Sequence, residues 1–237
     1  MRIPKLLLML PIGVFLSAPA VMASPIFGSF DFSGTITVAQ TPPPPTISWT
    51  LPPQTNKALI GSTSGPSFAG LSGTDLTIDN LTNPPASVDA AGFANQNFIS
   101  FDAAPLLPTL LINFIAEGVF SSASCMAAPA PGQTCTPNVP GGSPFSFINT
   151  SLNTSSATFV FSGVTSDGLS TWQGVFTSQF NHNFQSVLAS LATTGSVTNT
   201  YSGTITVTAI PEPNTLLLVF GAFGVLVGCI RKQRMKA

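Results

Sequence analysis

Acidic residues are the side chains of this sequence best suited to chemistry. Asp75 and Asp79 lie four positions apart, and an Asn-Leu-Thr-Asn-Pro-Pro turn follows Asp79, so carboxylate and amide oxygens could converge there on Ca²⁺. Two carboxylates facing one groove could instead hydrolyse a glycoside. Solvated turn acids are the simpler interpretation, and Asp167-Gly168 indicates a tight turn. We therefore treat Asp75 and Asp79 as a speculative metal site and predict no metal and no cofactor.

The single histidine restricts acid–base catalysis. Any His-based triad, metal site or imidazole base would depend on His182, which lies between Asn181 and Asn183 in a context that favours a loop or helix cap. The sequence contains no nucleophile elbow, phosphate-binding loop, HExxH motif or dinucleotide fingerprint. We therefore assign no catalytic residue and expect the chain not to be an enzyme.

Two cysteines lie ten positions apart in a segment rich in proline and glycine. In an oxidising compartment Cys125 and Cys135 should pair, because a disulfide would hold a loop that no helix or strand holds. A metal site would need further ligands nearby, which the segment does not supply. The sequence therefore predicts a Cys125–Cys135 disulfide.

Residues 1–23 have the order of a signal peptide. Arg2 and Lys5 precede an apolar run over residues 6–16, and small residues follow at the positions that signal peptidase reads. The run has 11 residues, about half of what spans a bilayer, which argues against an uncleaved anchor. We predict that signal peptidase cleaves between Ala23 and Ser24.

The C-terminus carries three features in series: a Pro-Glu-Pro motif, an apolar run over 215–230 and a basic tail over 231–237. A 16-residue helix rises about 24 Å, which suits a hydrocarbon core of about 30 Å if flanking residues snorkel. The positive-inside rule then places the tail in the cytoplasm and residues 24–210 outside. The motif and the basic residues of the tail are Pro211, Glu212, Pro213, Arg231, Lys232, Arg234 and Lys236.

This order closely resembles the PEP-CTERM sorting signal of Gram-negative bacteria, in which a membrane-embedded cysteine protease, exosortase, is thought to recognise the motif and remove the helix. The resemblance implies an exosortase-like partner at 211–213 and transient retention in the inner membrane through 215–230. It further implies sorting to the cell surface or extracellular matrix and an association with exopolysaccharide and biofilm. An ordinary single-pass anchor with a proline-rich stalk is the alternative.

Composition limits what residues 24–210 can bind. Charged residues make up 6% of the chain, against about a quarter in an ordinary soluble domain. Seven acids and one base, Lys57, give this part a net charge of -6, so nucleic-acid binding is not expected. A surface built from Ser, Thr, Asn and Gln is compatible with a hydrated polysaccharide matrix.

Residues 24–210 are predicted to form one all-β domain, an antiparallel β-sandwich or jelly-roll-like fold. The segment 33–38 repeats at 202–207, each copy follows an aromatic residue, and both alternate as half-buried strands do. We expect these first and last strands to lie near each other at one edge. Further strands are predicted at 47–51, 68–81, 98–101, 110–120, 145–149, 157–164 and 170–180.

One segment has helical periodicity. Phe184, Val187, Leu188 and Leu191 recur at the spacing of one helical face, and Asn181 or Asn183 could cap the helix. We expect this short helix to pack across one end of the sandwich. Aromatic residues at alternate positions of the strands are predicted to face the core, namely Phe145, Phe147, Phe159, Phe161, Trp172, Phe176 and Phe180.

Three functions remain open from the sequence. The leading one is a non-enzymatic structural or interaction protein of the cell surface or matrix. The second is a Ca²⁺-dependent carbohydrate-binding module whose loops use Asp75, Asp79 or Asp167. The third, a secreted hydrolase, needs two acids across a common cleft.

Overall fold

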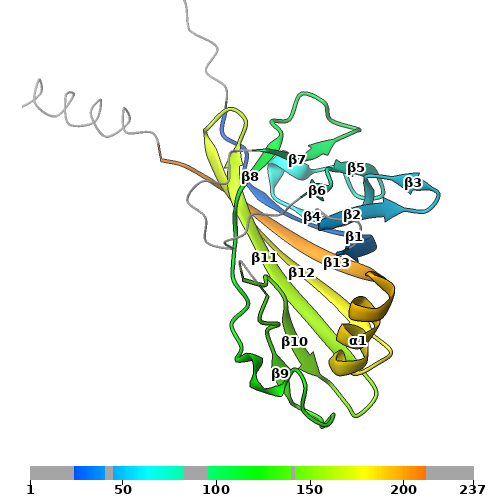
Figure 1. The fold of residues 1–237 in the computed structure, drawn as a ribbon. Helices are drawn as coiled ribbons and strands as arrows, with labels where there is room; N and C mark the ends of the chain where they lie inside the picture. The colour runs from blue at the N-terminus through cyan, green and yellow to red at the C-terminus, as the bar shows by residue number, and fades with distance from the viewer. Residues whose placement is uncertain (1–23, 41–44, 83–95, 140–141, 212–237) are drawn as a thin grey trace, which may run out of the picture.

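The structure is a computed structural model that describes residues 24–40, 45–82, 96–139 and 142–211 (Figure 1). Every strand pairing in these ranges is antiparallel, so the predicted all-β class with one α-helix is confirmed. The strands are β1 (Gly28–Ala39), β2 (Thr46–Leu51), β3 (Gln54–Thr55), β4 (Lys57–Ser64), β5 (Asp75–Ile78), β6 (Leu81–Thr82), β7 (Gln96–Phe101), β8 (Leu110–Ile115), β9 (Thr134–Cys135), β10 (Ser146–Asn149), β11 (Ser155–Thr165), β12 (Ser170–Phe180) and β13 (Ser196–Ala209). The helices are α1 (Phe184–Thr194) and the short 3-10 helices η1 (Pro66–Phe68) and η2 (Ser122–Ser124).

Eight of the strands close into a barrel rather than an open sandwich. Their order is β12, β13, β1, β4, β5, β7, β8 and β11, and β11 pairs again with β12. The long β11–β12 hairpin causes this closure, because β12 also pairs with β13 and so joins the two ends of the sheet. Closure leaves these eight strands without a free edge, which corrects the expected sandwich.

The two copies of the repeated segment are direct neighbours. β1 pairs with β13 over the whole length of β1, from Gly28 opposite Val207 to Ala39 opposite Ser196. The expected proximity is therefore confirmed. Their expected position at an edge is wrong, because β12 covers the other side of β13.

The repeat places an aromatic ring over a glycine on each strand. In the register of β1 and β13, Phe32 lies opposite Gly203, and Gly34 lies opposite Tyr201. A Cβ atom on Gly203 would lie 2.7 Å from Phe32 Cζ, and one on Gly34 would lie 3.2 Å from Tyr201 Cε1. The glycines therefore provide the space in which the two rings lie inside the barrel.

Aromatic side chains fill the barrel interior. Phe176 contacts rings from several strands, with centroids 5.0 Å from Phe159, 5.3 Å from Phe32 and 5.4 Å from Trp49. An eight-stranded barrel is just wide enough for side chains to fill it. The fully or almost fully buried rings are Phe30, Phe32, Trp49, Phe68, Phe98, Phe101, Phe159, Phe161, Trp172, Phe176 and Tyr201.

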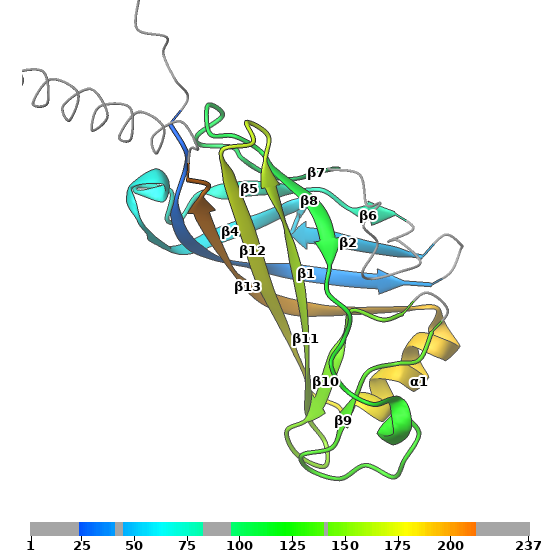
Figure 2. The same ribbon diagram turned by 90° about the vertical axis from the view of Figure 1, so that its left-hand side faces the viewer.

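At one end of the barrel the sheet divides into two wings. β1 pairs with β4 near its start, but its residues 35–39 pair with β2. β11 likewise pairs with β8 through residues 161–165, but its residues 155–158 pair with β10. Figure 2 shows α1, β9 and β10 at this end, which we call the divided end.

Most predicted elements are confirmed, with two corrections and one strand that was missed. The predicted strands at 47–51, 98–101, 145–149, 157–164 and 170–180 correspond to β2, β7, β10, β11 and β12. The predicted strand at 68–81 is interrupted, because Gly70 and Gly73 have φ of +83° and +79° and turn the chain before β5. The predicted strand at 110–120 ends at Ile115, and β4 was not predicted.

The predicted terminal segments fall mostly beyond the described residues. The signal peptide at 1–23, Glu212 and Pro213 of the motif, the predicted helix at 215–230 and the basic tail lie outside the described residues. Among the residues that the structure describes, none of the helices has the length and apolar character needed to span a bilayer. Ser24 and Pro211, which border these segments, are both exposed.

Gly163 of β11 gives a test of the barrel packing. It lies opposite Trp172, whose indole N–H donates to the Leu111 carbonyl oxygen at 2.9 Å. A Cβ on Gly163 would lie 1.8 Å from that oxygen and 2.8 Å from the indole nitrogen. Gly163→Ala should therefore lower the free energy of unfolding by about 3 kcal/mol or more, measured by urea denaturation.

Gly61→Ala is the matched control. Gly61 also lies in a strand, but its nearest neighbour to an added Cβ is the Asp31 carbonyl oxygen at 3.7 Å, an ordinary contact. We expect this variant to change the free energy of unfolding by less than about 1 kcal/mol. Equal losses in the two variants would contradict the packing described for β11.

Candidate functional site

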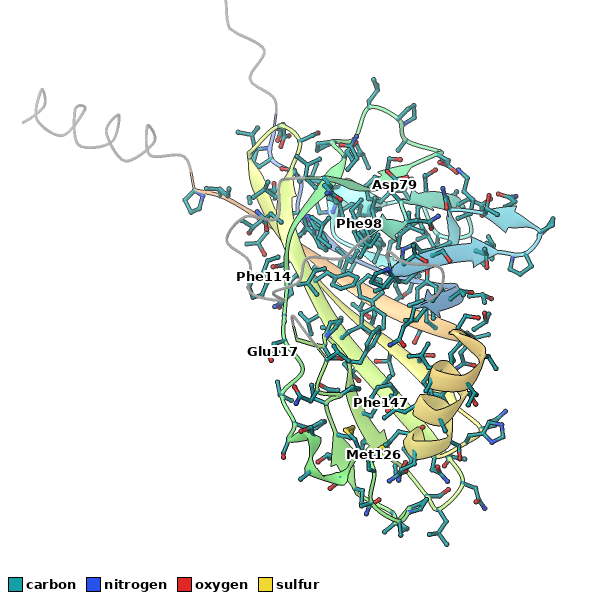
Figure 3. All side chains as sticks on the ribbon, viewed as in Figure 1. Asp79, Phe98, Phe114, Glu117, Met126 and Phe147 are labelled. Atoms are coloured by element: carbon teal, nitrogen blue, oxygen red, sulfur yellow. A yellow bond between two sulfur atoms is a disulfide. The ribbon has the colours of Figure 1, made fainter. Side chains whose placement is uncertain are left out.

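The speculative metal residues lie on the outer face of the barrel. Asp75 begins β5 and Asp79 follows it, while the residues between them alternate between core and surface. Lys57 donates to Thr77 Oγ1 at 2.6 Å and pairs with Asp102, so an ammonium group already lies at this face. Figure 3 shows Asp79 at this side of the barrel, away from the divided end.

Of the oxygen ligands expected beside Asp79, Asn80 is the one whose side chain the structure describes, since residues 83–85 lie outside the described residues. The Asn80 amide oxygen accepts from the Trp49 backbone N–H at 3.1 Å. Burial raises the pKa of Asp79, because partial desolvation penalises the charged form of its carboxyl group. Across the described ranges, no group of three or more His, Cys, Asp or Glu side chains is placed to hold a metal ion.

Asp167 and His182 have structural contacts. Asp167 lies in the turn between β11 and β12, where its carboxylate accepts from Thr165 Oγ1 at 2.5 Å and from the Leu169 N–H at 3.0 Å. His182 is exposed, and its backbone oxygen accepts from Ser155 Oγ at 2.7 Å. The structure does not bring Asp167 together with Asp75 and Asp79, because β11 and β5 are separated by β7 and β8 in the sheet.

Asp31 is the charged residue of the outer face shared by β1 and β13. Its carboxylate accepts from Ser62 and from Thr204 Oγ1, the latter at 2.6 Å. These hydrogen bonds hold the pKa of Asp31 below its usual value. Its stabilising contribution is therefore present at neutral pH and is lost as the pH falls through the lowered pKa.

The disulfide is formed as predicted, and it lies beneath α1. Cys125 and Cys135 are joined, with their Cα atoms 5.2 Å apart. Both are buried, and they belong to a second apolar cluster that includes Phe147 of β10 and Phe184 and Val187 of α1. The disulfide therefore fixes the loop against which the helix packs.

Asparagine and glutamine side chains fix the start of α1. Asn183 is the N-cap, and its side-chain oxygen accepts from the Ser186 N–H at 2.9 Å. The buried Asn149 of β10 accepts from the Phe184 N–H at 2.9 Å and donates to Gln185 Oε1 at 3.0 Å. Of the two predicted caps, Asn183 is the one observed.

A cavity of about 560 Å³ lies at the divided end, between α1, the two wings and the segment that leads into β10. Typical small-molecule sites have about 300–1,000 Å³. β1 and β2 contribute Ile36, Val38 and Ile47, while β10, β11 and β12 contribute Phe147, Ala157, Phe159, Ser178 and Phe180. α1 contributes Val187, Leu188, Leu191 and Ala192.

The cavity runs from the barrel core to the surface. At its inner end lie Ile47, Ile115 and Phe159, which are at most 3% exposed and belong to the main core cluster. At its outer end lie Gln40 and Ala192, which are exposed. As the described residues line it, the space therefore has an apolar inner end and an opening to solvent.

Polar groups of the lining are few and largely paired. Ser178 Oγ donates to the Thr200 carbonyl oxygen at 2.8 Å, and Asn199 Nδ2 donates to Ser178 Oγ at 2.8 Å and to the Gln179 carbonyl oxygen at 2.6 Å. Among the described residues that line the cavity, none is Asp, Glu, Lys, Arg or His. The site can therefore hold an apolar group, and its lining supplies no ionisable side chain for acid–base chemistry.

Two buried polar atoms lack a hydrogen-bond partner among the described residues, Trp49 Nε1 and the Tyr201 hydroxyl. Both belong to the aromatic core, where their rings lie 5.0 Å apart, and neither residue lines the cavity. Burial raises the pKa of Tyr201, so the phenol stays neutral. These atoms therefore do not add a polar contact to the cavity.

Sequence reasoning did not find the cavity. Phe145, Phe147, Phe159 and Phe180 were expected to be core residues, and the inner ends of the lining are indeed core. The signal that pointed toward it is the apolar face of α1, since Val187, Leu188 and Leu191 all line the cavity. The space itself depends on how far the two wings diverge, which no local pattern of residues reports.

Comparison with models of protein families, with curated proteins and with solved structures found no match for this chain.

The disulfide gives a test of how the divided end is held together. Replacing both cysteines, Cys125→Ala with Cys135→Ala, should lower the free energy of unfolding by about 2–3 kcal/mol, because the unfolded chain loses a short closed loop. The measurement is urea denaturation under oxidising conditions.

Wild-type protein treated with dithiothreitol serves as the control. It should lose about as much stability as the double variant, and the variant itself should not respond to the reductant. An unfolding midpoint of the wild type that reduction leaves unchanged would show that the bond does not support this end of the barrel.

Proposed function

We propose that this chain is an exported, non-enzymatic structural or interaction protein of the cell surface or extracellular matrix. In this proposal, signal peptidase removes residues 1–23, and an exosortase-like protease processes a PEP-CTERM signal formed by Pro211, Glu212, Pro213, a transmembrane helix at 215–230 and the basic tail. The barrel at 24–210 is the part that remains outside, in association with exopolysaccharide.

The observation that carries the proposal is the outer face of β13 and its neighbours. Its outward residues Thr198, Thr200, Ser202, Thr204, Thr206 and Thr208 are all exposed hydroxyl-bearing side chains. Adjacent strands continue the pattern, since Thr198 lies opposite Thr37 and Ser202 lies opposite Ser33 and Thr177. We call these outward residues of β13 the hydroxyl face.

Hydroxyl groups in this arrangement suit a hydrated polysaccharide. Each hydroxyl group can donate and accept a hydrogen bond. When a neutral sugar approaches this face, no charged side chain of the face has to lose its hydration. Asp31 is the one ionised residue on the outward sides of β12, β13 and β1 in the described structure. The hydroxyl face therefore supports an interaction role in a polysaccharide matrix.

The positions of the barrel ends support the sorting part of the proposal. Gly28 near the start of the domain pairs with Val207 near its end, so the chain enters and leaves the barrel at the same end. Figure 1 shows these ends of β1 and β13 opposite the end that carries α1. Pro211 is exposed directly beyond β13, where a protease could reach it. A membrane helix after it would leave the divided end pointing away from the bilayer.

Mass measurement of the released protein tests the proposal. In a host that contains the exosortase, the released protein should lack the segment after the motif. In the same host without the exosortase, the full C-terminal segment should remain attached. The control variant, Glu212→Ala in the host with the enzyme, should reproduce the mass seen without it.

Two results would contradict the sorting proposal. One is a C-terminal helix that stays attached equally with and without the exosortase. The other is a released mass that is the same for the wild type and for Glu212→Ala in both hosts. Either would leave an ordinary single-pass anchor as the better account of residues 211–237.

A further inference from the structure

We propose that the cavity at the divided end binds a single unbranched alkyl or acyl chain, with the uncharged tail inside and the polar end at the opening. This binding site is separate from the hydroxyl face and does not depend on how the chain is sorted.

The shape of the lining favours a chain with one apolar end. The inner end is formed by Ile47, Ile115 and Phe159, which belong to the barrel core. The outer end is formed by exposed residues, among them Gln40 and Ala192. An alkyl tail placed along this direction is removed from water at its inner end. Its polar end stays in contact with water at the opening.

Electrostatics determine the class of ligand. No described lining residue is ionisable, so a charged group inside the cavity would lose its hydration without a partner. The seven acids and one base of residues 24–210 also disfavour an anionic head group at the opening. The ligand is therefore neutral along its buried part, and a neutral head group is preferred over a carboxylate.

Polar atoms of the lining do not call for a polar ligand. Ser178 and Asn199 are bonded to each other and to backbone carbonyl oxygens of neighbouring strands. Ser143 Oγ accepts from the Phe145 N–H at 3.3 Å. A sugar in this space would therefore find few free partners, whereas an alkyl chain needs none.

The apolar terminal segment of the same chain does not fit as the occupant. Val197 lines the cavity and Ala209 ends β13, and the 12 residue steps from one to the other rise about 40 Å along the strand. Residues 210–214 can extend only about 18 Å from that far end. The run at 215–230 therefore begins about 22 Å or more from Val197, and as a helix of about 24 Å it could reach the cavity with its last turn only.

The binding experiment uses the full chain in a detergent-free buffer. N-phenyl-1-naphthylamine, an uncharged fluorophore, should bind with one-to-one stoichiometry, and 1-dodecanol should displace it. Affinity should rise from 1-octanol to 1-dodecanol by about threefold to fourfold per CH₂. At pH 8, dodecanoate should displace the probe less effectively than 1-dodecanol.

Three variants locate the site. Ala157→Phe fills the space between β11 and α1, and Ala192→Trp blocks the opening, so each should weaken 1-dodecanol at least about tenfold. The matched control is Ala189→Trp, which places the same side chain on an exposed position of α1 outside the lining and should leave the affinity unchanged. If Ala157→Phe fails to fold, Ala192→Trp and its control decide.

Several results would overturn the proposal. They are the absence of saturable probe binding, equal weakening by Ala192→Trp and Ala189→Trp, or tighter binding of dodecanoate than of 1-dodecanol. Sedimentation of the ligand-free protein could give a further contradicting result. A dimer that Ala192→Trp disrupts and that does not bind the probe would show that the cavity is occupied by a second copy of the chain.

Discussion

Aromatic rings that lie over glycines of neighbouring strands are the contact on which the barrel depends. Phe32 lies over Gly203, Tyr201 over Gly34 and Trp172 over Gly163, and in each case a methyl group on the glycine would collide with the ring or with the backbone behind it. Large rings fill the interior of a small barrel only where the facing strands leave room for them. The repeated aromatic-Ser-Gly sequence is therefore a packing device, and it pairs the first and last strands of the barrel.

At the divided end the strands diverge because they differ in length. β11, β12, β13 and β1 are longer than β4, β5, β7 and β8, so they extend beyond the closed part of the barrel, where β1 pairs with β2 and β11 pairs with β10. The inner surface of this extension is still apolar, as strands of a barrel require on their inward side. α1, held by Asn149 and Asn183 and supported by the disulfide, covers part of it. The uncovered remainder is the cavity.

Local signals in the sequence were enough for most elements but not for the site. Alternation and turn residues located β2, β7, β10, β11 and β12, the period of Phe184 to Leu191 located α1, and the spacing of Cys125 and Cys135 indicated their bond. The closed barrel was not predicted because it depends on one pairing between strands, β11 with β12, that leaves the pattern of each strand unchanged. β4 was not predicted because its second half, from Gly61 to Ser64, contains only Gly, Ser and Thr. The residue types of Asp75 and Asp79 suggested a metal site. In the structure, the ion pair of Lys57 and Asp102 occupies the same face.

The central claim is that the divided end holds a preformed apolar cavity that opens to the surface. Diffraction from crystals of the protein under xenon pressure tests it most directly, because xenon enters apolar cavities without needing a polar partner. The account predicts xenon density between Phe147, Ala157 and Leu188, with no movement of α1. Side chains that fill this space, or an ordered cluster of waters that xenon does not displace, would contradict it.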